Sequence, residues 1–474
     1  MSKKKYIHFV GIKGVGMTPL ALIAKGAGFQ VTGSDLEKEF ITDVALRKAN
    51  ITPFVGFSSD HVMGPDFVIT TGAHGGFNNV EVLAAKAKKI PVVTQGEAVG
   101  LFMSGKLFVK KWKGISITGT HGKTTTTAML ATVLAENKLD PTYVIGTGDV
   151  GSLPAPGHFG KGHYFIAEAD EYMSEPHYDK TIKFLWQYPE IAVFTNIEFD
   201  HPDVYNSVDD VRNAFAKFAQ QISPSGVLIA YGDDPQVRLL LKTYNKKVIT
   251  YGFNPENNFI LKQVNISGDQ TFFWVESNGV SLGQFGLRVA GEHNALNALA
   301  VIIVALEIGI PLEKIKKGLL AFAGSKRRLE FIGELTSGAR VYDDYAHHPT
   351  EIRTTLTTLR KQYPKKKILC VFQPHTYSRT RMLFGEFTKA FDNIDELFVV
   401  VTDIYASLRE QPDNAISGKK LVDAIAFSKK DVHYLPNLTD VVQYINEKKL
   451  RSDTILVTMG AGDVYTIHSK LNFV

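Results

Sequence analysis

The segment from Ile115 to Thr127 reads Ile-Ser-Ile-Thr-Gly-Thr-His-Gly-Lys-Thr-Thr-Thr-Thr and continues into apolar residues. A short β-branched run, a glycine turn and a string of hydroxyl side chains are typical of a nucleoside-triphosphate site, where a strand delivers a tight loop to a helix. In such a loop backbone N–H groups surround the phosphates, Lys123 would neutralise them and Thr124 would face a magnesium ion. The segment therefore predicts an α/β fold that binds ATP or GTP.

The glycine spacing of this loop departs from the common phosphate-binding pattern G-x-x-x-x-G-K-[ST]. Ile117 stands where the first glycine of that pattern would be, so that Gly119 and Gly122 remain. The shorter form, G-T-H-G-K-T, narrows the choice of family more than the common motif does.

Length and composition set the broad class of the protein. The chain has 474 residues, enough for about three domains of ordinary size. Hydrophobic residues make up 44% and charged residues 21%, which is typical of a soluble globular protein. The net charge of +5 is spread over segments of mixed sign and is weak evidence for a nucleic-acid partner. The single cysteine, Cys370, lies in an apolar run, where we expect a buried thiol.

Two observations bear on targeting. No segment approaches the length of an apolar membrane span. Gly11, Lys13 and Gly14 interrupt the first apolar run too early for the core of a signal peptide. We therefore expect a cytoplasmic protein with no membrane partner and no nucleic-acid partner.

Segments that look like strands alternate with segments that look like helices in three successive series, which predicts parallel sheets covered by helices. In the first series we expect, among other elements, a strand at residues 6–10 and a helix near residues 36–48. Residues 258–289 instead show short strands with Asn/Gly turns, which predicts a small antiparallel sheet in the second unit.

The predicted fold is α/β with three domains, and we place the boundaries near Gly105 and Gly324. The outer two domains are expected to be Rossmann-like, and the central one to be an ATPase domain that contains the phosphate loop. The expected domains are 1–105, 106–324 and 325–474.

A second glycine turn, Gly11-Ile12-Lys13-Gly14-Val15-Gly16, follows the first predicted strand and precedes a helix. In this context glycines let the backbone approach a diphosphate, although the dinucleotide fingerprint has the different spacing G-x-G-x-x-G. Asp35 lies about twenty residues further on, where an acid can bond a ribose hydroxyl. The turn alone is compatible with NAD, FAD or a nucleotide sugar, and also with a turn that only packs strand against helix.

Acidic residues follow two predicted strands of the central unit. Glu168 and Asp170 end one strand, and Asp200-His201 follows another. In an open parallel sheet these strand ends face the crevice that holds the phosphate loop. Magnesium prefers a few hard oxygen ligands, which Glu168 and Thr124 can supply. Solvated acids at the start of loops are the alternative.

Polar segments also follow predicted strands around the third unit. His375, Arg379 and Arg381 lie in the loop Gln-Pro-His-Thr-Tyr-Ser-Arg-Thr-Arg, and such groups suit a carboxylate ligand. The segment Asp-Asp-Tyr-Ala-His-His-Pro, residues 343–349, ends a strand and places a proline at a helix start. Arg327-Arg328 could be surface residues, and the polar residues 291–294 could be helix caps.

Together these motifs resemble those of the Mur ligases, in the same order and over essentially the whole chain. The segments that carry the resemblance are 11–16, 119–124, 168–170, 200–201, 291–294, 327–330, 344–349 and 373–381. The resemblance implies an ATP-dependent amide ligase of peptidoglycan precursor synthesis, from the branch that joins L-alanine to UDP-N-acetylmuramate. It also implies that domain one binds the UDP moiety, domain two ATP and Mg²⁺, and domain three the amino acid.

The resemblance further implies a role for individual residues. The ATP-binding residues would be Gly119, Thr120, His121, Gly122, Lys123, Thr124, Thr125, Asn294, Arg328 and Asp344. The catalytic residues would be Lys123, His201, Arg328 and His121. One magnesium would be held by Thr124 and Glu168 and a second by His201. The UDP substrate would contact Gly11, Gly14, Val15, Gly16, Met17, Asp35 and Thr71. The amino acid would contact Tyr345, His347, His375 and Arg379.

Two positions depart from patterns within the family. Several relatives carry a carbamylated lysine in the helix after the Asp-His motif, and the nearest position here is Phe215, with Lys217 two residues on. We therefore expect no carbamate. Many alanine-adding relatives have arginine where this chain has Thr376, which leaves L-alanine, L-serine and glycine open as the amino acid.

Other functions remain alternatives from the sequence alone. The recycling ligase that attaches a whole tripeptide to UDP-N-acetylmuramate shares the first two sites, but residues 373–380 favour a single amino acid. A nicotinamide oxidoreductase would leave Lys123 unexplained, and a nucleotide-gated binding protein would not need the histidines and arginines of the third unit. We expect a monomer or weak homodimer.

Overall fold

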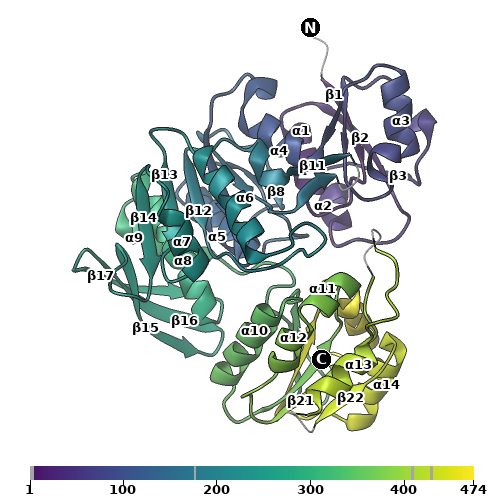
Figure 1. Ribbon diagram of the computed structural model, residues 1–474, viewed down its shortest axis with the longest axis vertical. Coiled ribbons are helices and arrows are strands. Elements are labelled where there is room, and N and C mark those ends of the chain that lie inside the picture. Colours follow the sequence, from purple (N-terminus) through teal and green to yellow (C-terminus); the bar gives the residue numbers. More distant parts are fainter. Residues whose placement is uncertain (1–4, 176–177, 407–409, 428–430) are drawn as a thin grey trace.

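The computed structural model describes residues 5–175, 178–406, 410–427 and 431–474. Its ribbon forms three lobes, with the N-terminal lobe at the upper right, the central lobe at the left and the C-terminal lobe below (Figure 1). Each lobe is built on its own mainly parallel sheet with helices packed against it. The predicted α/β fold class is therefore confirmed.

The N-terminal lobe has a parallel sheet in the order β3-β2-β1-β4-β5. Its strands are β1 (Tyr6–Val10), β2 (Gln30–Asp35), β3 (Phe54–Val55), β4 (Phe67–Thr70) and β5 (Val92–Thr94). Its helices are α1 (Thr18–Gly26), α2 (Asp43–Lys48), α3 (Val80–Ala87) and α4 (Gln95–Met103), with short 3₁₀ turns at Ser59–His61, Gly76–Asn78 and Lys106–Phe108. The glycine turn lies between β1 and α1, as the sequence predicts.

The helix predicted near residues 36–48 is wrong in its first half, because α2 begins at Asp43. The ammonium of Lys13 donates to the carbonyls of Leu36 (2.9 Å) and Lys38 (3.0 Å). The Lys13 side chain thus ties this segment to the glycine turn, a tertiary interaction that helix propensity cannot anticipate.

The central lobe contains one continuous sheet in the order β17-β16-β15-β14-β13-β12-β6-β9-β7-β8. Its strands are β6 (Lys113–Thr118), β7 (Thr142–Val144), β8 (Gly157–His158), β9 (Tyr164–Glu168), β12 (Ile191–Phe194), β13 (Val227–Tyr231), β14 (Val248–Gly252), β15 (Phe259–Ser267), β16 (Gln270–Ser277) and β17 (Val280–Leu287). Its helices are α5 (Lys123–Glu136), α6 (Val208–Gln220), α7 (Pro235–Leu241), α8 (Glu292–Glu307) and α9 (Leu312–Ala321), with a 3₁₀ turn at Lys183–Trp186. A short antiparallel pair, β10 (Met173–Glu175) and β11 (Asp179–Ile182), lies apart from this sheet.

The antiparallel strands predicted for residues 258–289 are present, but they do not form a separate sheet. Strand β15 pairs in parallel with β14 through Tyr251 with Phe259 and Gly252 with Ile260. It then pairs antiparallel with β16, which pairs antiparallel with β17. The hairpins thus extend the parallel sheet, because the start of β15 still finds a free edge on β14.

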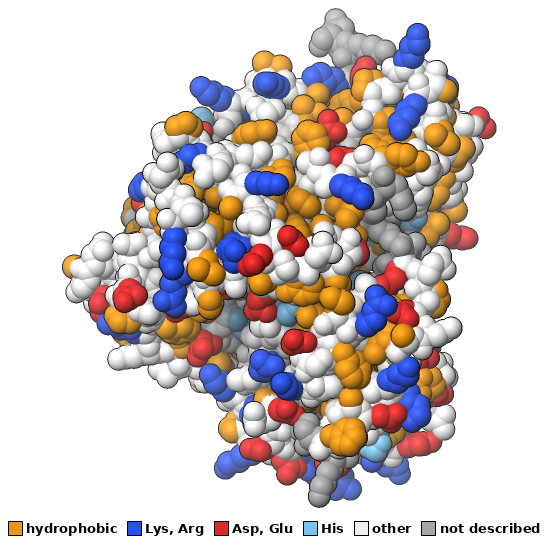
Figure 2. All heavy atoms as spheres, in the orientation of Figure 1, with side chains coloured by type: hydrophobic (Ala, Val, Ile, Leu, Met, Phe, Trp, Pro, Cys, Tyr) orange, Lys and Arg blue, Asp and Glu red, His pale blue; other side chains and the backbone are white. Residues whose placement is uncertain are grey.

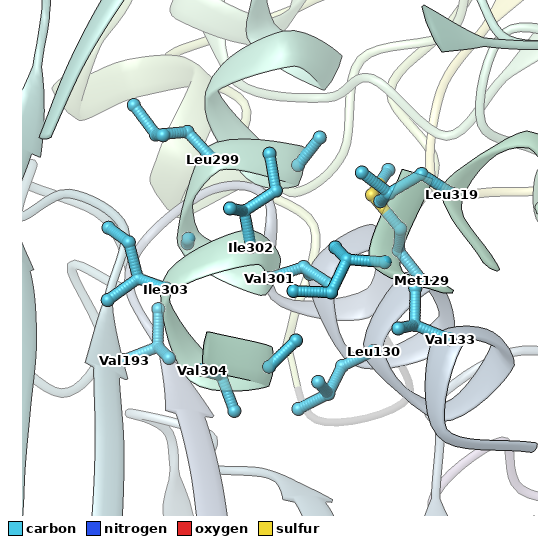
Figure 3. Packing of buried hydrophobic residues seen from close by; sticks show 14 of the residues in the cluster. Met129, Leu130, Val133, Val193, Leu299, Val301, Ile302, Ile303, Val304 and Leu319 are labelled. Atoms are coloured by element: carbon cyan, nitrogen blue, oxygen red, sulfur yellow. The ribbon is translucent and has the colours of Figure 1, made fainter. Parts of the chain in front are cut away.

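Helix α8 is the centre of the main core. Almost every residue from Asn294 to Ala305 is buried, which is typical of a helix enclosed on all sides. Its side chains Leu299, Val301, Ile302, Ile303 and Val304 pack among Met129, Leu130 and Val133 of α5, Val193 of β12 and Leu319 of α9 (Figure 3). Burying each large aliphatic side chain contributes about 1.5–3 kcal/mol, so this packing holds the start of α5 in place.

The C-terminal lobe has a sheet in the order β18-β19-β23-β20-β21-β22, in which β18 is antiparallel to β19 and the other pairs are parallel. Its strands are β18 (Glu330–Glu334), β19 (Arg340–Asp344), β20 (Lys367–Phe372), β21 (Leu397–Val401), β22 (Val432–Tyr434) and β23 (Thr454–Met459). Its helices are α10 (Pro349–Gln362), α11 (Tyr377–Met382), α12 (Phe384–Lys389), α13 (Gly418–Ile425) and α14 (Leu438–Lys448), with a 3₁₀ segment at Val464–Lys470. Cys370 is buried in β20, as predicted, and burial raises the pKa of its thiol.

The two junctions between lobes differ in chemistry. Helix α1 packs against β7 and β8, and one apolar cluster contains both Ile23 of α1 and Phe165 of β9. The central and C-terminal lobes are instead linked by ion pairs, including Asp200 with Arg379 and Glu292 with Lys361. Polar junctions of this kind are typical of domains that move relative to each other.

Charges of both signs are scattered over all three lobes on the face seen in Figure 2. This agrees with the mixed-sign charge pattern of the sequence. Within the described ranges, no helix is both long enough and apolar enough to span a membrane.

Candidate functional site

The phosphate loop joins the end of β6 to the start of α5. Gly119 and Gly122 have φ angles of 140° and 84°, in the region that favours glycine. A Cβ atom on Gly119 would lie 1.9 Å from Thr195 Oγ1, so a side chain cannot be accommodated there. The two glycines that the sequence retains are therefore both required by the backbone.

Lys123, the first residue of α5, is folded over this loop. Its ammonium donates to the carbonyls of Gly119 (2.6 Å) and Thr120 (3.2 Å) and to Glu171 Oε1 (2.9 Å). Burial alone would lower the pKa of Lys123, but the nearby carboxylates of Glu171 and Asp170 raise it above its usual value. Lys123 is thus a fixed positive charge at the mouth of the loop.

The acids predicted at the strand ends do converge on the loop. Glu168 Oε1 accepts from Gly146 N (2.7 Å), and its Oε2 accepts from Thr124 Oγ1 (3.3 Å). Burial raises the pKa of Glu168. Close by, one ligand atom from each of Asp170, Glu171 and His201 lies within 4.8 Å of the other two. The side chains beside the loop therefore form two groups. Glu168 contacts Thr124 in one, and His201 lies close to Asp170 and Glu171 in the other.

A cavity of about 430 Å³ lies where the three lobes meet and brings most of the predicted site together. It is lined by residues of the phosphate loop, by the acids just described and by Arg328. From the N-terminal lobe come Gly14, Val15, Gly16, Met17 and Thr71, and from the C-terminal lobe come Tyr345, His347, His375 and Arg379. Residues far apart in sequence that were predicted to bind three different ligands thus share one cavity.

A second cavity, of about 330 Å³, is also lined by residues of the phosphate loop. Thr125, Asn294 and Asp344, all predicted to bind ATP, line it together with the aromatic rings of Tyr231 and Tyr251. His121, Gly122, Thr124 and Arg328 line both cavities. The phosphate loop therefore contributes both to a partly aromatic pocket that suits a nucleoside and to a chamber with many charged side chains that suits phosphate chemistry.

Asn294 and Asp344 are held firmly in this second pocket. Asn294 Nδ2 donates to Ala290 O (2.7 Å). Asp344 accepts from Thr355 Oγ1 (2.6 Å) and from Ala346 N (3.0 Å). Burial raises the pKa of Asp344 to about 6, so its charge state changes close to neutral pH.

Three predicted residues, Gly11, Asp35 and Gly119, do not line either cavity. Gly11 has a φ of 80°, and a Cβ there would lie 2.5 Å from Thr71 Cγ2. Asp35 accepts from the backbone N–H groups of Lys13 (2.7 Å) and Leu36 (2.8 Å), so it holds the glycine turn in shape. Its contact with a ribose hydroxyl stays a prediction.

The adjacent arginines of the third unit point in different directions. Arg327 is buried, donating to Asp343 Oδ2 (2.9 Å) and to the carbonyls of Gly460 (2.6 Å) and Gly462 (3.2 Å). Arg328 donates to Thr124 Oγ1 (3.3 Å) in the central lobe. Arg327 therefore anchors the C-terminal lobe, whereas Arg328 reaches the phosphate loop.

This difference makes the two arginines separable by mutation. Arg327→Ala is expected to lower the free energy of unfolding by about 3–5 kcal/mol, because it leaves Asp343 buried without its partner. Arg328→Ala is expected to change that free energy by less than about 1 kcal/mol, since the side chain is partly exposed. If Arg328 neutralises bound phosphates, as its motif predicts, the substitution should instead lower the turnover rate by about 100-fold. Denaturant unfolding and steady-state turnover of both variants test this, and equal losses of stability would contradict it.

Arg379 is buried at the junction of the central and C-terminal lobes. Its Nε and Nη2 donate to the two carboxylate oxygens of Asp200 (2.7 and 3.2 Å), and its Nη1 donates to His375 O (2.8 Å). Burial alone would raise the pKa of Asp200, but Arg379 and His201 hold it well below its usual value. Arg379 thus lies in the shared cavity while bridging two lobes.

Two histidines near this bridge are uncharged at neutral pH. Burial lowers the pKa of His347 to about 4 and holds that of His375 well below its usual value, so both rings are neutral. Thr376 does not line the cavity; it accepts from Arg379 N (3.5 Å) and caps α11. Thr376 therefore serves as a helix cap and not as part of the cavity wall.

His121 of the phosphate loop contacts the C-terminal lobe. Its Nδ1 donates to Glu351 Oε1 (3.2 Å), and its Nε2 lies 3.6 Å from Glu198 Oε2. Burial alone would lower the pKa of His121, but the two carboxylates raise it to about 10. His121 therefore forms an ionic link between the loop and α10.

Several residues that line the site or contact the phosphate loop were not predicted from the sequence. Asn196 Oδ1 accepts from His121 N (2.8 Å), and Glu198 lies two residues further along the same strand-end loop. Asn297 lies one helical turn after Asn294 and lines the second cavity. It packs against Gly122 so closely that a Cβ atom on Gly122 would lie 2.7 Å from Asn297 Oδ1. The i, i+3 spacing of the two asparagines was a usable signal. Glu351 follows His348 by three residues and could have been found as a capping box.

The helix that follows the Asp-His motif is α6. Phe215 is fully buried there and packs against Phe184 and Phe194, while Lys217 is exposed.

Comparison with known families gives consecutive matches along the chain. The Mur ligase family catalytic domain matches residues 6–107, the Mur ligase middle domain residues 117–305, and the Mur ligase glutamate ligase domain residues 327–462. These matches run through all three lobes.

Individual proteins also align over nearly their whole length. The UDP-N-acetylmuramate–L-alanine ligase of Desulfitobacterium hafniense is 41% identical over 467 residues, covering 98% of this chain and 99% of the relative. That of Caldanaerobacter subterraneus is 37% identical over 473 residues, covering 99% and 98%. The crystal structure of UDP-N-acetylmuramate–alanine ligase from Thermotoga maritima is 30% identical, with a TM-score of 0.79 over 98% of this chain and 97% of that one. A murein peptide ligase from Psychrobacter arcticus shares the fold, with a TM-score of 0.71 at 24% identity over 98% of each chain.

Proposed function

Since this chain belongs to the Mur ligase family, we propose that it joins L-alanine to the muramoyl carboxylate of UDP-N-acetylmuramate, converting ATP to ADP and phosphate. The reaction makes a precursor of peptidoglycan and so serves cell-wall growth and division. The observation that carries this proposal is the cavity where residues of all three lobes surround the phosphate loop. A ligase with three substrates needs such a meeting point.

The proposed chemistry has two steps. A carboxylate oxygen of the muramoyl group attacks the γ-phosphorus of ATP, and the bond to ADP breaks to leave an acyl phosphate. The amine of L-alanine then attacks the acyl carbon, the bond to phosphate breaks, and the amine loses a proton. The first step replaces hydroxide, a poor leaving group, by phosphate. The protein contributes mainly positioning and charge neutralisation.

Lys123 and Arg328 are the proposed phosphate ligands. Lys123 Nζ already lies against the loop carbonyls, and Arg328 reaches Thr124 from the other lobe. With ATP bound, both cations would exchange these contacts for β- and γ-phosphate oxygens. Asn294 and Asp344 would contact the adenosine in the partly aromatic pocket. His121 would lie near the reacting carboxylate.

The side chains beside the loop fit magnesium. Thr124 and Glu168 offer oxygen donors next to each other, and His201 lies with Asp170 and Glu171 in a second group. We propose that Thr124 and Glu168 hold one ion and His201 a second. Magnesium bound there supplies positive charge to the phosphates during transfer.

The remaining assignments are also proposals. We place domain 1–105 at the UDP moiety through Gly11, Gly14, Val15, Gly16, Met17, Asp35 and Thr71, domain 106–324 at ATP, and domain 325–474 at the amino acid. Tyr345, His347, His375 and Arg379 would hold that amino acid. We also propose a monomer or weak homodimer. A cytoplasmic location is part of the same proposal, and the proposed use of ATP supports it.

The direct test is phosphate release from ATP with UDP-N-acetylmuramate as acceptor. L-alanine, L-serine, glycine and the tripeptide L-alanyl-γ-D-glutamyl-meso-diaminopimelate are offered in parallel. We expect the highest kcat/KM with L-alanine. Turnover with the tripeptide alone would select the recycling reaction, and an absence of turnover with every amine would remove the ligase proposal.

The proposed role of Asp344 predicts a pH dependence. Its folded pKa of about 6 lies above the usual value for an aspartate, so the carboxylate that would accept a ribose hydroxyl is lost as pH falls through about 6. The KM for ATP should therefore rise by about 10-fold between pH 7.5 and pH 5. In Asp344→Asn the KM should be higher throughout and nearly independent of pH. A wild-type KM that stays constant across this range would contradict the assignment.

A further inference from the structure

A group of side chains outside the proposed magnesium sites lies between the phosphate loop and the C-terminal lobe. It consists of His121 on the loop, Glu198 after β12 and His348 at the start of α10. Glu198 Oε2 lies 3.6 Å from His121 Nε2 and 3.8 Å from His348 Nδ1. Ligand atoms about 2.0–2.2 Å from one tetrahedral metal ion are separated by similar distances.

The other nitrogen of each imidazole ring is already occupied by an acceptor. His121 Nδ1 donates to Glu351 Oε1 (3.2 Å), and His348 Nε2 donates to Phe199 O (3.3 Å). These bonds leave His121 Nε2 and His348 Nδ1 facing Glu198. Metal-binding histidines are oriented in this way, with the outer N–H bonded to a carboxylate or a backbone carbonyl.

Two further contacts support a built site. Within the described part of the chain, His121 Nε2 is buried and makes no hydrogen bond. Glu198 Oε2 accepts from Thr350 Oγ1 (2.7 Å), which orients the carboxylate toward the two rings. The group therefore has three convergent ligand atoms, an outer layer that holds each of them, and one buried nitrogen without a hydrogen bond.

We propose that His121, Glu198 and His348 form a binding site for a divalent transition-metal ion such as Zn²⁺, which joins the phosphate loop to the C-terminal lobe. The two imidazoles select against magnesium, which prefers oxygen ligands. Three protein ligands leave one position for water or for an anion. An ion bound here would hold the two lobes together and so slow the opening that product release requires.

The metal has to compete with existing bonds. The pKa of His121, raised to about 10 by Glu198 and Glu351, means that this ring carries two protons at neutral pH. His348 Nδ1 also accepts from Thr350 N (3.2 Å) as the cap of α10. Binding at pH 7.5 should therefore release about one proton per ion. Calorimetric titration with Zn²⁺ in buffers of different ionisation enthalpy measures that number.

Co²⁺ is the spectroscopic probe, because its four-coordinate complexes absorb visible light far more strongly than its six-coordinate ones. The full-length protein is freed of metal with a chelator and titrated with CoCl₂, with Mg²⁺ in large excess to occupy oxygen-rich sites. We expect one equivalent of strongly absorbing Co²⁺, displaced by Zn²⁺. Weak, six-coordinate absorption alone would overturn the proposal.

His348→Asn is the decisive variant, since asparagine retains the helix cap and removes one ligand. It should weaken Co²⁺ binding by more than about 10-fold and abolish the strong absorption. Glu198→Gln keeps an acceptor for Thr350 and should act in the same way. His158→Asn is the matched control, because His158 pairs with Asp140 on the surface and lines neither cavity.

Strong Co²⁺ absorption that survives in both His348→Asn and Glu198→Gln would overturn the proposal, as would its loss in the His158 control. Unfolding curves recorded without metal show whether each variant is folded. The proposal rests on the side-chain geometry and not on the ligase reaction, so the metal titration succeeds or fails separately from the phosphate-release assay.

Discussion

Replacing Lys123 with methionine is expected to lower kcat for phosphate release by about 100-fold to 1,000-fold. The ammonium is the fixed positive charge at the mouth of the phosphate loop, and a preorganised charge at a transferring phosphoryl group lowers the barrier by about 3–4 kcal/mol. Methionine keeps much of the side-chain volume and its helix propensity, so that the change is mainly one of charge. Initial rates at saturating ATP, UDP-N-acetylmuramate and L-alanine measure the effect.

The control for Lys123 is Lys113→Met, at the exposed start of the strand that leads to the same loop. It should retain at least about half of the wild-type activity, since exposed substitutions away from special contacts have small effects. The Lys123 variant also leaves Glu171 buried without its cation, so its melting temperature is measured in parallel. A folded Lys123→Met protein with nearly wild-type kcat would contradict the phosphate role.

Arg379→Ala is expected to raise the KM for L-alanine by about 10-fold to 100-fold, because a charged hydrogen bond to a carboxylate contributes about 1.5–3 kcal/mol. The same change leaves Asp200 buried without its bidentate partner, at a cost in folding free energy of about 3–5 kcal/mol. Asp200 and Arg379 belong to different lobes, so the contact between those lobes weakens as well. Amino-acid saturation curves and denaturant unfolding measure the two effects.

Two further variants separate binding from bridging. Arg381→Ala removes an exposed arginine two residues along that pairs with Asp413, and it should change neither the KM nor the stability appreciably. Asp200→Asn breaks the same bridge but keeps the guanidinium of Arg379. If Arg379 holds the amino-acid carboxylate, the KM for L-alanine rises much more in Arg379→Ala than in Asp200→Asn. Equal KM values in those two variants would assign Arg379 to bridging alone.

Much of the fold could be predicted from local patterns. The strand at Tyr6–Val10 has the predicted bounds, because a continuous apolar run followed by turn residues is typical of a buried parallel strand. The main errors occurred where a distant group competes with local preference. Lys13 holds the segment before α2, and the edge of β14 recruits β15 into the larger sheet.

The same distinction between local sequence patterns and contacts of distant residues applies to the site. The strand-end rule correctly brought Glu168 and His201 to the cavity of the phosphate loop, because parallel strands end at one edge of a sheet. The rule cannot say which partner each side chain takes. Arg327 and Arg328 are adjacent in sequence, yet one is a buried anchor and the other reaches the phosphate loop.

The sequence was sufficient to predict the phosphate loop, the three α/β units and the family, because glycines, strand runs and the order of motifs can be read directly along a chain. Only the packed structure shows that His121 lies between Glu198 and Glu351, and that Arg379 is paired with Asp200. These contacts join residues up to 230 positions apart. Burial then sets the charge of each group, since it depends on every neighbour that excludes water and not on the residue type alone.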